Sequence, residues 1–160
     1  MPFLATEAPA ATEALVTNDG FFPDVDPADL RDTQRLDGTV TAQRLQAEVV
    51  AAVIAINSQL DAWRGERVAE GFATLDAIDA IAGKPVAKIG GKSALVQLYT
   101  RAVYCTAHAV LIERYRNFDA TATARKDDDV ARPGADELRR DALWAINDIL
   151  GKRRTTVELI

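Results

Sequence analysis

SALVQLYTRAVYCTAHAVLIERYRNF, residues Ser93–Phe118, is the stretch of sequence on which the fold depends. Apolar side chains recur along it every three or four residues, which is the spacing of one helix face. They are Leu95, Leu98, Ala102, Cys105, Ala109 and Ile112, with Val96, Val103, Val110 and Leu111 on the flanks. A helix of this length spans about 39 Å. The sequence therefore predicts a long central helix, opened by Ser93 as N-cap, that other helices cover.

Three further helices are predicted around it. Asp26 and Pro27 open a short one that ends near Leu36, because Asp is a favoured N-cap and Pro a favoured first residue. A second runs from Thr41 to about Glu70, and a last one follows Gly134 or Asp136 and ends at Gly151. Their apolar stripes are Leu45, Val49, Val53, Ile56, Leu60 and Trp63, and Leu138, Ala142, Ala145, Ile146 and Ile149. We expect Leu98, Ala102, Cys105 and Ala109 to be buried against Val49, Val53, Ile56 and Ile146.

The predicted fold class is all-α, a small bundle of about four helices with an extended N-terminal arm and a C-terminal tail. Residues 1–20 have no sustained period and are assigned to the arm, residues 21–151 to the helical domain, and residues 152–160 to an extended docking tail. Glycine and proline interrupt residues 71–92, which predicts a long loop, with a helical turn or two weakly paired strands as alternatives.

Composition limits the class of protein. The chain has 160 residues, of which 48% are hydrophobic and 27% charged, enough for one globular core. No apolar run reaches the roughly 18 residues of a membrane span, and the first residues lack the basic and apolar regions of a signal peptide, so neither is expected. A single cysteine, Cys105, excludes an internal disulfide and fits a reducing compartment such as a cytoplasm.

The net charge of −5 is concentrated at the front of the chain. Residues 1–40 hold eight acids and two bases, for −6, and the remaining residues hold sixteen acids and seventeen bases, for +1. Five of the acids lie on or beside the predicted first helix: Asp24, Asp26, Asp29, Asp32 and Asp37. We expect them either to form an ordinary solvated face or to repel DNA that slides past.

No catalytic, cofactor or metal site is predicted. Gly90–Ser93, GGKS, resembles the end of a phosphate-binding loop, but Val86 stands where that loop needs its first glycine, so a flexible cap is the better interpretation. His108 and Cys105 lack the further His or Cys ligands that zinc requires, so a packed histidine is expected. Asp127–Asp129 lack the glycine and glutamate of a calcium loop.

Three segments carry a resemblance to a known family. They are DGFFPDVDPADLRDTQRLDGTVT (Asp19–Thr41), LYTRAVYCTAHAVLIERYRNFD (Leu98–Asp119) and LRRDALWAINDILGKRRTTVELI (Leu138–Ile160). They resemble the head completion protein (GPL) family of tailed phages. The resemblance covers the chain from Asp19 to Ile160 and is weakest in residues 77–92 and 1–18.

The resemblance implies a non-enzymatic virion protein that joins the capsid neck after DNA packaging, having been made in the host cytoplasm. The implied assembly is a ring of about twelve copies below the portal protein. A tail or tail-terminator protein would be a further partner, with genomic DNA passing through the lumen without sequence-specific binding and no membrane involved. The residues expected to bind partners are Arg114, Tyr115, Arg116, Arg153, Arg154, Thr155, Thr156, Val157, Leu159 and Ile160.

The alternative is a DNA-binding protein or small-terminase-like packaging factor. In that interpretation a local basic patch contacts phosphates: Arg139, Arg140, Lys152, Arg153 and Arg154. The same residues could instead meet acids on an adjacent subunit or keep the surface solvated. Because the chain is acidic and lacks a dense basic stripe, the structural role is preferred.

Overall fold

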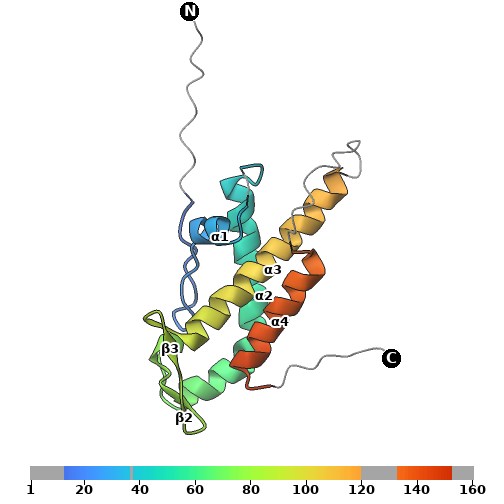
Figure 1. The fold of residues 1–160 in the computed structure, drawn as a ribbon. Coiled ribbons are helices and arrows are strands. Elements are labelled where there is room, and N and C mark those ends of the chain that lie inside the picture. The colour runs from blue at the N-terminus through green and yellow to red at the C-terminus, as the bar shows by residue number, and fades with distance from the viewer. Residues whose placement is uncertain (1–12, 37, 120–132, 153–160) are drawn as a thin grey trace, which may run out of the picture.

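The computed structural model describes residues 13–36, 38–119 and 133–152, with the backbone alone at 115–119. Its α-helices are α1 (Pro27–Thr33), α2 (Ala42–Ala69), α3 (Ala94–Asp119) and α4 (Ala135–Ile149). α3 runs diagonally through the molecule with α4 along one side and α2 behind it (Figure 1). No described helix has the length and apolar character needed to cross a bilayer.

The central position predicted for residues 93–118 is confirmed. Ala102, Cys105 and Ala109 are buried, as are the residues of α2 and α4 expected to cover them, while Leu98 is half-buried. The partners differ from the prediction in one respect. Cys105 and Ala109 pack with Ala135, Leu138 and Ala142 at the start of α4, not with α2. α3 therefore uses separate faces for its two neighbours.

The helix boundaries follow the predicted caps in most places. The Asp26 carboxylate accepts from Ala28 N at 2.9 Å with Pro27 as first residue, and the Thr41 hydroxyl accepts from Arg44 N at 3.3 Å. Gly134 is the N-cap of α4, and Gly151, at φ +66°, follows its C-cap. α1 stops at Thr33, three residues earlier than predicted, before Arg35 takes a positive φ.

Short strands make the all-α prediction incomplete. β1 (Ala80–Ile81) pairs with β2 (Lys84–Pro85), and β3 (Lys88–Ile89) with β4 (Lys92–Ser93), both antiparallel, after the 3-10 turn η1 (Leu75–Ala77). The region predicted as a loop with two open alternatives thus contains both a helical turn and paired strands. The second hairpin delivers the chain directly into α3.

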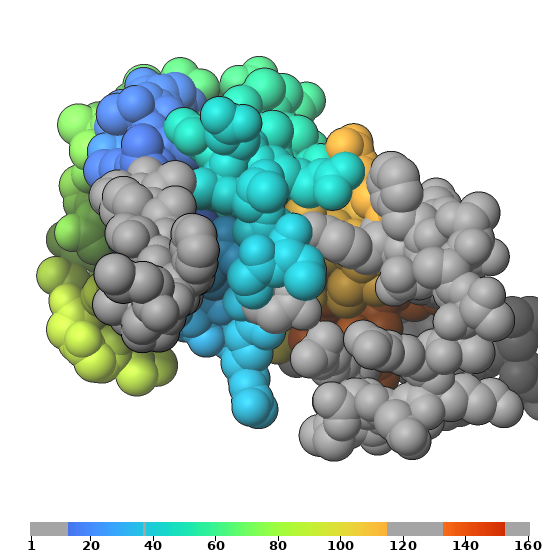
Figure 2. Space-filling model, turned by 90° about the horizontal axis from the view of Figure 1, so that it is seen from above, coloured from blue at the N-terminus to red at the C-terminus, as the bar shows by residue number. Residues whose placement is uncertain are grey.

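Residues 13–20, the last eight residues of the predicted arm, lie against the helices. Val16 is buried and exchanges two backbone hydrogen bonds with Val25, and Glu13 forms an ion pair with Arg31 of α1. Seen from above, the blue N-terminal residues and the teal residues of α2 share one face (Figure 2). The folded body therefore extends at least to residue 13, and the proposed arm is limited to residues outside the described range.

A hydrogen-bonded triad joins this segment to α2 and α3. Asn18 Nδ2 donates to Tyr99 Oη at 2.8 Å, Tyr99 Oη donates to Asn57 Oδ1 at 2.6 Å, and Asn57 Nδ2 donates to Asn18 Oδ1 at 2.8 Å. The Tyr99 ring, fully buried, also stacks on Phe22 at 4.7 Å. Burial raises the pKa of Tyr99 from 10.0 to about 12. The triad is a part-buried polar network at the edge of the apolar core.

Tyr99→Phe tests this network. The substitution removes the hydroxyl that the half-buried amide groups of Asn18 and Asn57 share, so we expect a loss of about 0.5–1.5 kcal/mol in the free energy of unfolding. A tyrosine with a raised folded-state pKa contributes stability that is complete below the unfolded pKa and disappears as pH rises through the folded one. The melting temperature of the wild type should therefore fall more steeply between pH 10 and about 12 than that of Tyr99→Phe.

Tyr104 serves as the internal control. It is present in both proteins, and burial together with its bond to Asp29 raises its pKa as well. It therefore contributes a common alkaline decline to both melting curves. Parallel curves for wild type and variant across this range would contradict the assigned role of Tyr99.

Candidate partner-binding surfaces

The residues predicted to bind partners fall in three places. Arg114 lies on α3 and forms an ion pair at 2.6 Å with Glu48 of α2, whose side chain is only 6% exposed. Tyr115 and Arg116 continue α3, but their side chains lie outside the described residues, as do Arg153–Ile160. Arg114 therefore neutralises a buried carboxylate of its own chain. Its charge is balanced by this contact and needs no acid from a partner protein.

Two arginines of the basic patch in the alternative interpretation, Arg139 and Arg140, are engaged within the chain, whereas Lys152 is exposed. Arg139 forms an ion pair with Glu113 of α3, and this bond raises its pKa. Arg140 lies 4.8 Å above the Trp144 ring and 3.6 Å from Asp141, which also pairs with Arg101 at 3.0 Å. The charges on the outer side of α4 are thus paired with acids, which weakens a phosphate-binding role for them.

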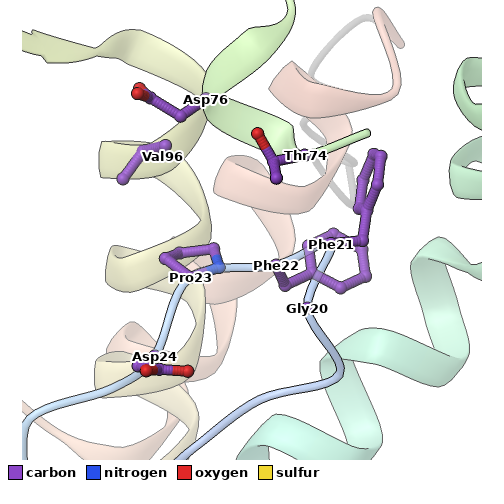
Figure 3. Close-up of a pocket in the computed structure, with 8 residues that line it drawn as sticks. All are labelled: Gly20, Phe21, Phe22, Pro23, Asp24, Thr74, Asp76 and Val96. Carbon is purple, nitrogen blue, oxygen red and sulfur yellow. The ribbon is translucent and has the colours of Figure 1, made fainter. Parts of the chain in front are cut away.

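The acidic front is exposed as predicted, at Asp24, Asp26, Asp29 and Asp32, while Asp37 lies outside the described residues. A shallow hollow of about 360 Å³ opens beside it, lined by Phe22, Pro23 and Val96 among others. Figure 3 shows Asp24 at one end of this hollow and Asp76 at the other, with Pro23 and Val96 between them. Two carboxylates around an apolar floor disfavour an anionic ligand at this place.

The solvent-facing side of α2 was not predicted from the sequence to be a contact surface. Ile54 is 65% exposed and Val50 39%, and the other exposed residues from 47 to 59 are uncharged. Residues 49–60, VVAAVIAINSQL, contain no charged side chain at all. The apolar residues Val50 and Ile54, which lie outside the inner stripe of α2, were a signal of an extra contact surface, because the inner stripe alone covers α3.

A second hollow, about 120 Å³, lies between α2 and α4 and adjoins this surface. Ile56 and Gln59 of α2 line it, together with Thr106 of α3 and residues of α4. Those of α4 are Arg139, Ala142, Leu143 and Ile146, and Leu143 is 52% exposed. Sequence periodicity could not locate this hollow, because it depends on how α2 and α4 are spaced across α3.

The described residues offer no metal-binding group of three or more His, Cys, Asp or Glu side chains. His108 is packed as predicted, with Nδ1 3.0 Å from Gln34 Oε1, and burial raises the pKa of Cys105, which disfavours its thiolate. Gly90 and Gly91 form the turn between β3 and β4. The Ser93 hydroxyl is buried and makes no hydrogen bond within the described chain, so its predicted capping bond is wrong.

Comparison with known proteins agrees with the resemblance found in the sequence. Residues 16–160 match the model of the phage head completion protein (GPL) family. The head completion/stabilization protein of Escherichia phage P2 is 39% identical over 152 residues, which cover 95% of this chain and 86% of that protein. No solved structure matches. Because the family match spans residues 16–160 of the 160, the chain belongs to the phage head completion protein (GPL) family.

Proposed function

We propose that this protein completes and stabilises a phage head by assembling as a closed ring at the neck, below the portal, after the genome has been packaged. The observation that carries the proposal is the family match from residue 16 to residue 160, together with the P2 relative of that description. A ring of identical copies needs two different surfaces on each subunit, one for each neighbour. The described body offers separate exposed surfaces on α2 and near the acidic front.

The charge distribution supports passage of DNA rather than capture of it. Exposed carboxylates gather at the front of the chain, and Arg139 and Arg140 are paired with acids of α3 and α4. With the acidic front directed toward the lumen, the ring would repel phosphates and let the genome slide without adhering. Retention of the genome then depends on the ring as a physical plug beneath the portal, prepared for a tail protein.

The C-terminal residues 153–160 are the proposed docking element. They follow the helix stop at Gly151, and Thr155, Thr156 and Val157 favour an extended backbone whose amides and carbonyls need partners. Arg114, Tyr115 and Arg116 remain a second proposed contact region, with Arg114 contributing less because Glu48 already holds it.

Deletion of residues 155–160 tests the docking role. We expect nearly unchanged helical circular dichroism and melting temperature, because α4 ends before this segment, and a loss of incorporation into DNA-filled heads. The conservative variant Thr155→Ser is the control and should complete heads normally. Unfolding of the truncated chain, or normal head completion by it, would exclude the docking role.

A salt titration of DNA affinity separates the proposal from the DNA-binding alternative. A protein that neutralises phosphates releases counterions, so its affinity falls steeply as salt rises. We expect affinity close to background at physiological salt and no change on Arg140→Gln, because Arg140 is held by Asp141 and Trp144. Tight binding with a steep salt slope that Arg140→Gln reduces would favour the packaging-factor role instead.

A further inference from the structure

We propose that the two β-hairpins before α3 contact the phosphate backbone of the packaged DNA through Lys84, Lys88 and Lys92 of each copy in the ring. The inference rests on the proposed function, because the ring brings the genome within reach of every copy. It adds to the physical plug an electrostatic contact that retains the DNA at one level of the lumen.

The three lysines carry charge that the described chain leaves uncompensated. Each is exposed, and none forms an ion pair with another described residue. Residues 80–93 contain these three bases and no acid, for a local charge of +3. Asp76 and Asp79 come just before this stretch and are exposed, but neither is paired with a lysine in the part of the chain that the structure describes.

The arginines of the four helices differ from these lysines. Every helical arginine whose side chain the structure describes has a partner in its own chain. A guanidinium is a planar fork suited to fixed pairs, whereas a lysine ammonium is a mobile point charge on a flexible stem. Lysines therefore suit phosphates that pass at changing positions, because each ammonium can follow the nearest one.

The backbone under the lysines is fixed to α3. Gln97 Nε2 donates to Ile89 O at 2.8 Å and to Lys92 O at 3.0 Å, on the two sides of the second hairpin turn. Ala94 N, at the start of α3, donates to Ala87 O at 2.9 Å. The hairpin is therefore a support on which only the long side chains need to adjust to a ligand.

The three charges lie close enough together to form one patch. Successive lysines are four residues apart, so their Cα atoms are separated by at most about 14 Å. The pairing of β3 with β4 places Lys92 opposite Ile89, which adjoins Lys88. Duplex DNA carries one charge per about 1.7 Å of its axis, so a patch of this width meets several phosphates at once.

The lysine patch adjoins the acidic front. The hollow beside Asp24 extends to Val96 in the first turn of α3, and β4 ends immediately before that turn. In Figure 1 the hairpins lie at the end of the molecule where α3 begins. With the front directed toward the lumen, the hairpins reach the lumen at an adjacent level, so the DNA slides past the acids and is retained at the lysines.

The composition of the hairpins favours phosphates over an acidic protein as the partner. Ile89, 65% exposed, is the one large apolar side chain exposed on residues 80–93, and the other exposed residues besides lysine are alanine, glycine and proline. Protein interfaces are enriched in aromatic residues and arginine at their centre and depleted in lysine and alanine. Non-specific contact with DNA needs positive charge alone.

The contact depends on the assembled ring. Three phosphate contacts give a salt slope of only about −3, so an isolated chain binds DNA weakly at physiological salt. A closed ring presents the same lysines from every copy, and linked contacts strengthen one another. This agrees with the background affinity expected above for the free protein.

Formaldehyde cross-linking of DNA-filled heads tests the contact, because it joins lysine amines to DNA bases within reach. After digestion of the DNA, mass spectrometry locates the adducts on the protein. We expect adducts on Lys84, Lys88 or Lys92 and none on Lys152, which is also exposed but follows α4.

A charge-removal series measures what the contact does. The triple variant Lys84→Gln, Lys88→Gln, Lys92→Gln should keep the wild-type melting temperature and number of copies per head, because its changed side chains are exposed. Its filled heads should lose DNA about tenfold faster at physiological salt, and rising salt should accelerate the loss from wild-type heads only. Lys88→Gln should have a smaller effect, and Lys152→Gln, the matched single control, none.

Two results would overturn the inference. One is a head that contains the triple variant in full number, retains DNA as the wild type does at every salt concentration, and shows no adducts on the hairpins in the wild type. The other is exclusion of the folded triple variant from heads, which would assign the lysines to an acidic protein instead.

The count of wild-type copies in filled heads separates this inference from the proposed function. If wild-type copies are present at the neck but yield no hairpin adducts, the ring stands and only the lysine contact is wrong. If wild-type copies are absent from the neck, the proposed function is wrong and the inference fails with it.

Discussion

Burial of α3 on separate faces is the constraint on which the rest of the structure depends. One face, with Ala102 and Val103, joins the large core shared with α2, and another, with Cys105 and Ala109, joins the start of α4. Small residues at these positions let both neighbours approach closely, while Tyr99 near the start of α3 holds the N-terminal segment through Asn18. Shifting α3 would disturb both helix contacts and the hydrogen-bonded triad together.

This arrangement also explains where the free surfaces lie. α2 needs only its inner stripe to cover α3, yet its outer side carries Val50 and Ile54, and no charge interrupts residues 49–60. On α4, Arg139 and Arg140 are paired with acids, so they do not form a free basic surface. Exposed acids also gather at the front of the chain, and this charge is better suited to a channel for DNA than to a clamp on it.

The sequence predicted what depends on local pattern. The helices and their buried stripes followed from periodicity, and Asp26, Thr41 and Gly151 marked their ends by cap chemistry. Two-residue strands are too short to show alternation, so the hairpins could be predicted only as one of several possibilities.

Contacts between distant residues were the part that local pattern could not supply. Asn18 and Asn57 are polar residues 39 positions apart, and the spacing of apolar residues cannot predict the hydrogen bond between them. Arg114 was expected to meet another protein. Its ion pair with Glu48 was missed because Glu48 belongs to a different helix. The hollow beside Leu143 likewise arises only when α2 and α4 are placed across α3.

Assembly of this protein at the head vertex is the central claim, and electron cryomicroscopy of purified DNA-filled heads tests it most directly. The account predicts density for a closed ring of this fold below the portal of filled heads, with α2 of each copy against its neighbour, and no such density on heads that have not packaged DNA. Copies spread over the capsid shell, or filled heads that lack the ring, would contradict it.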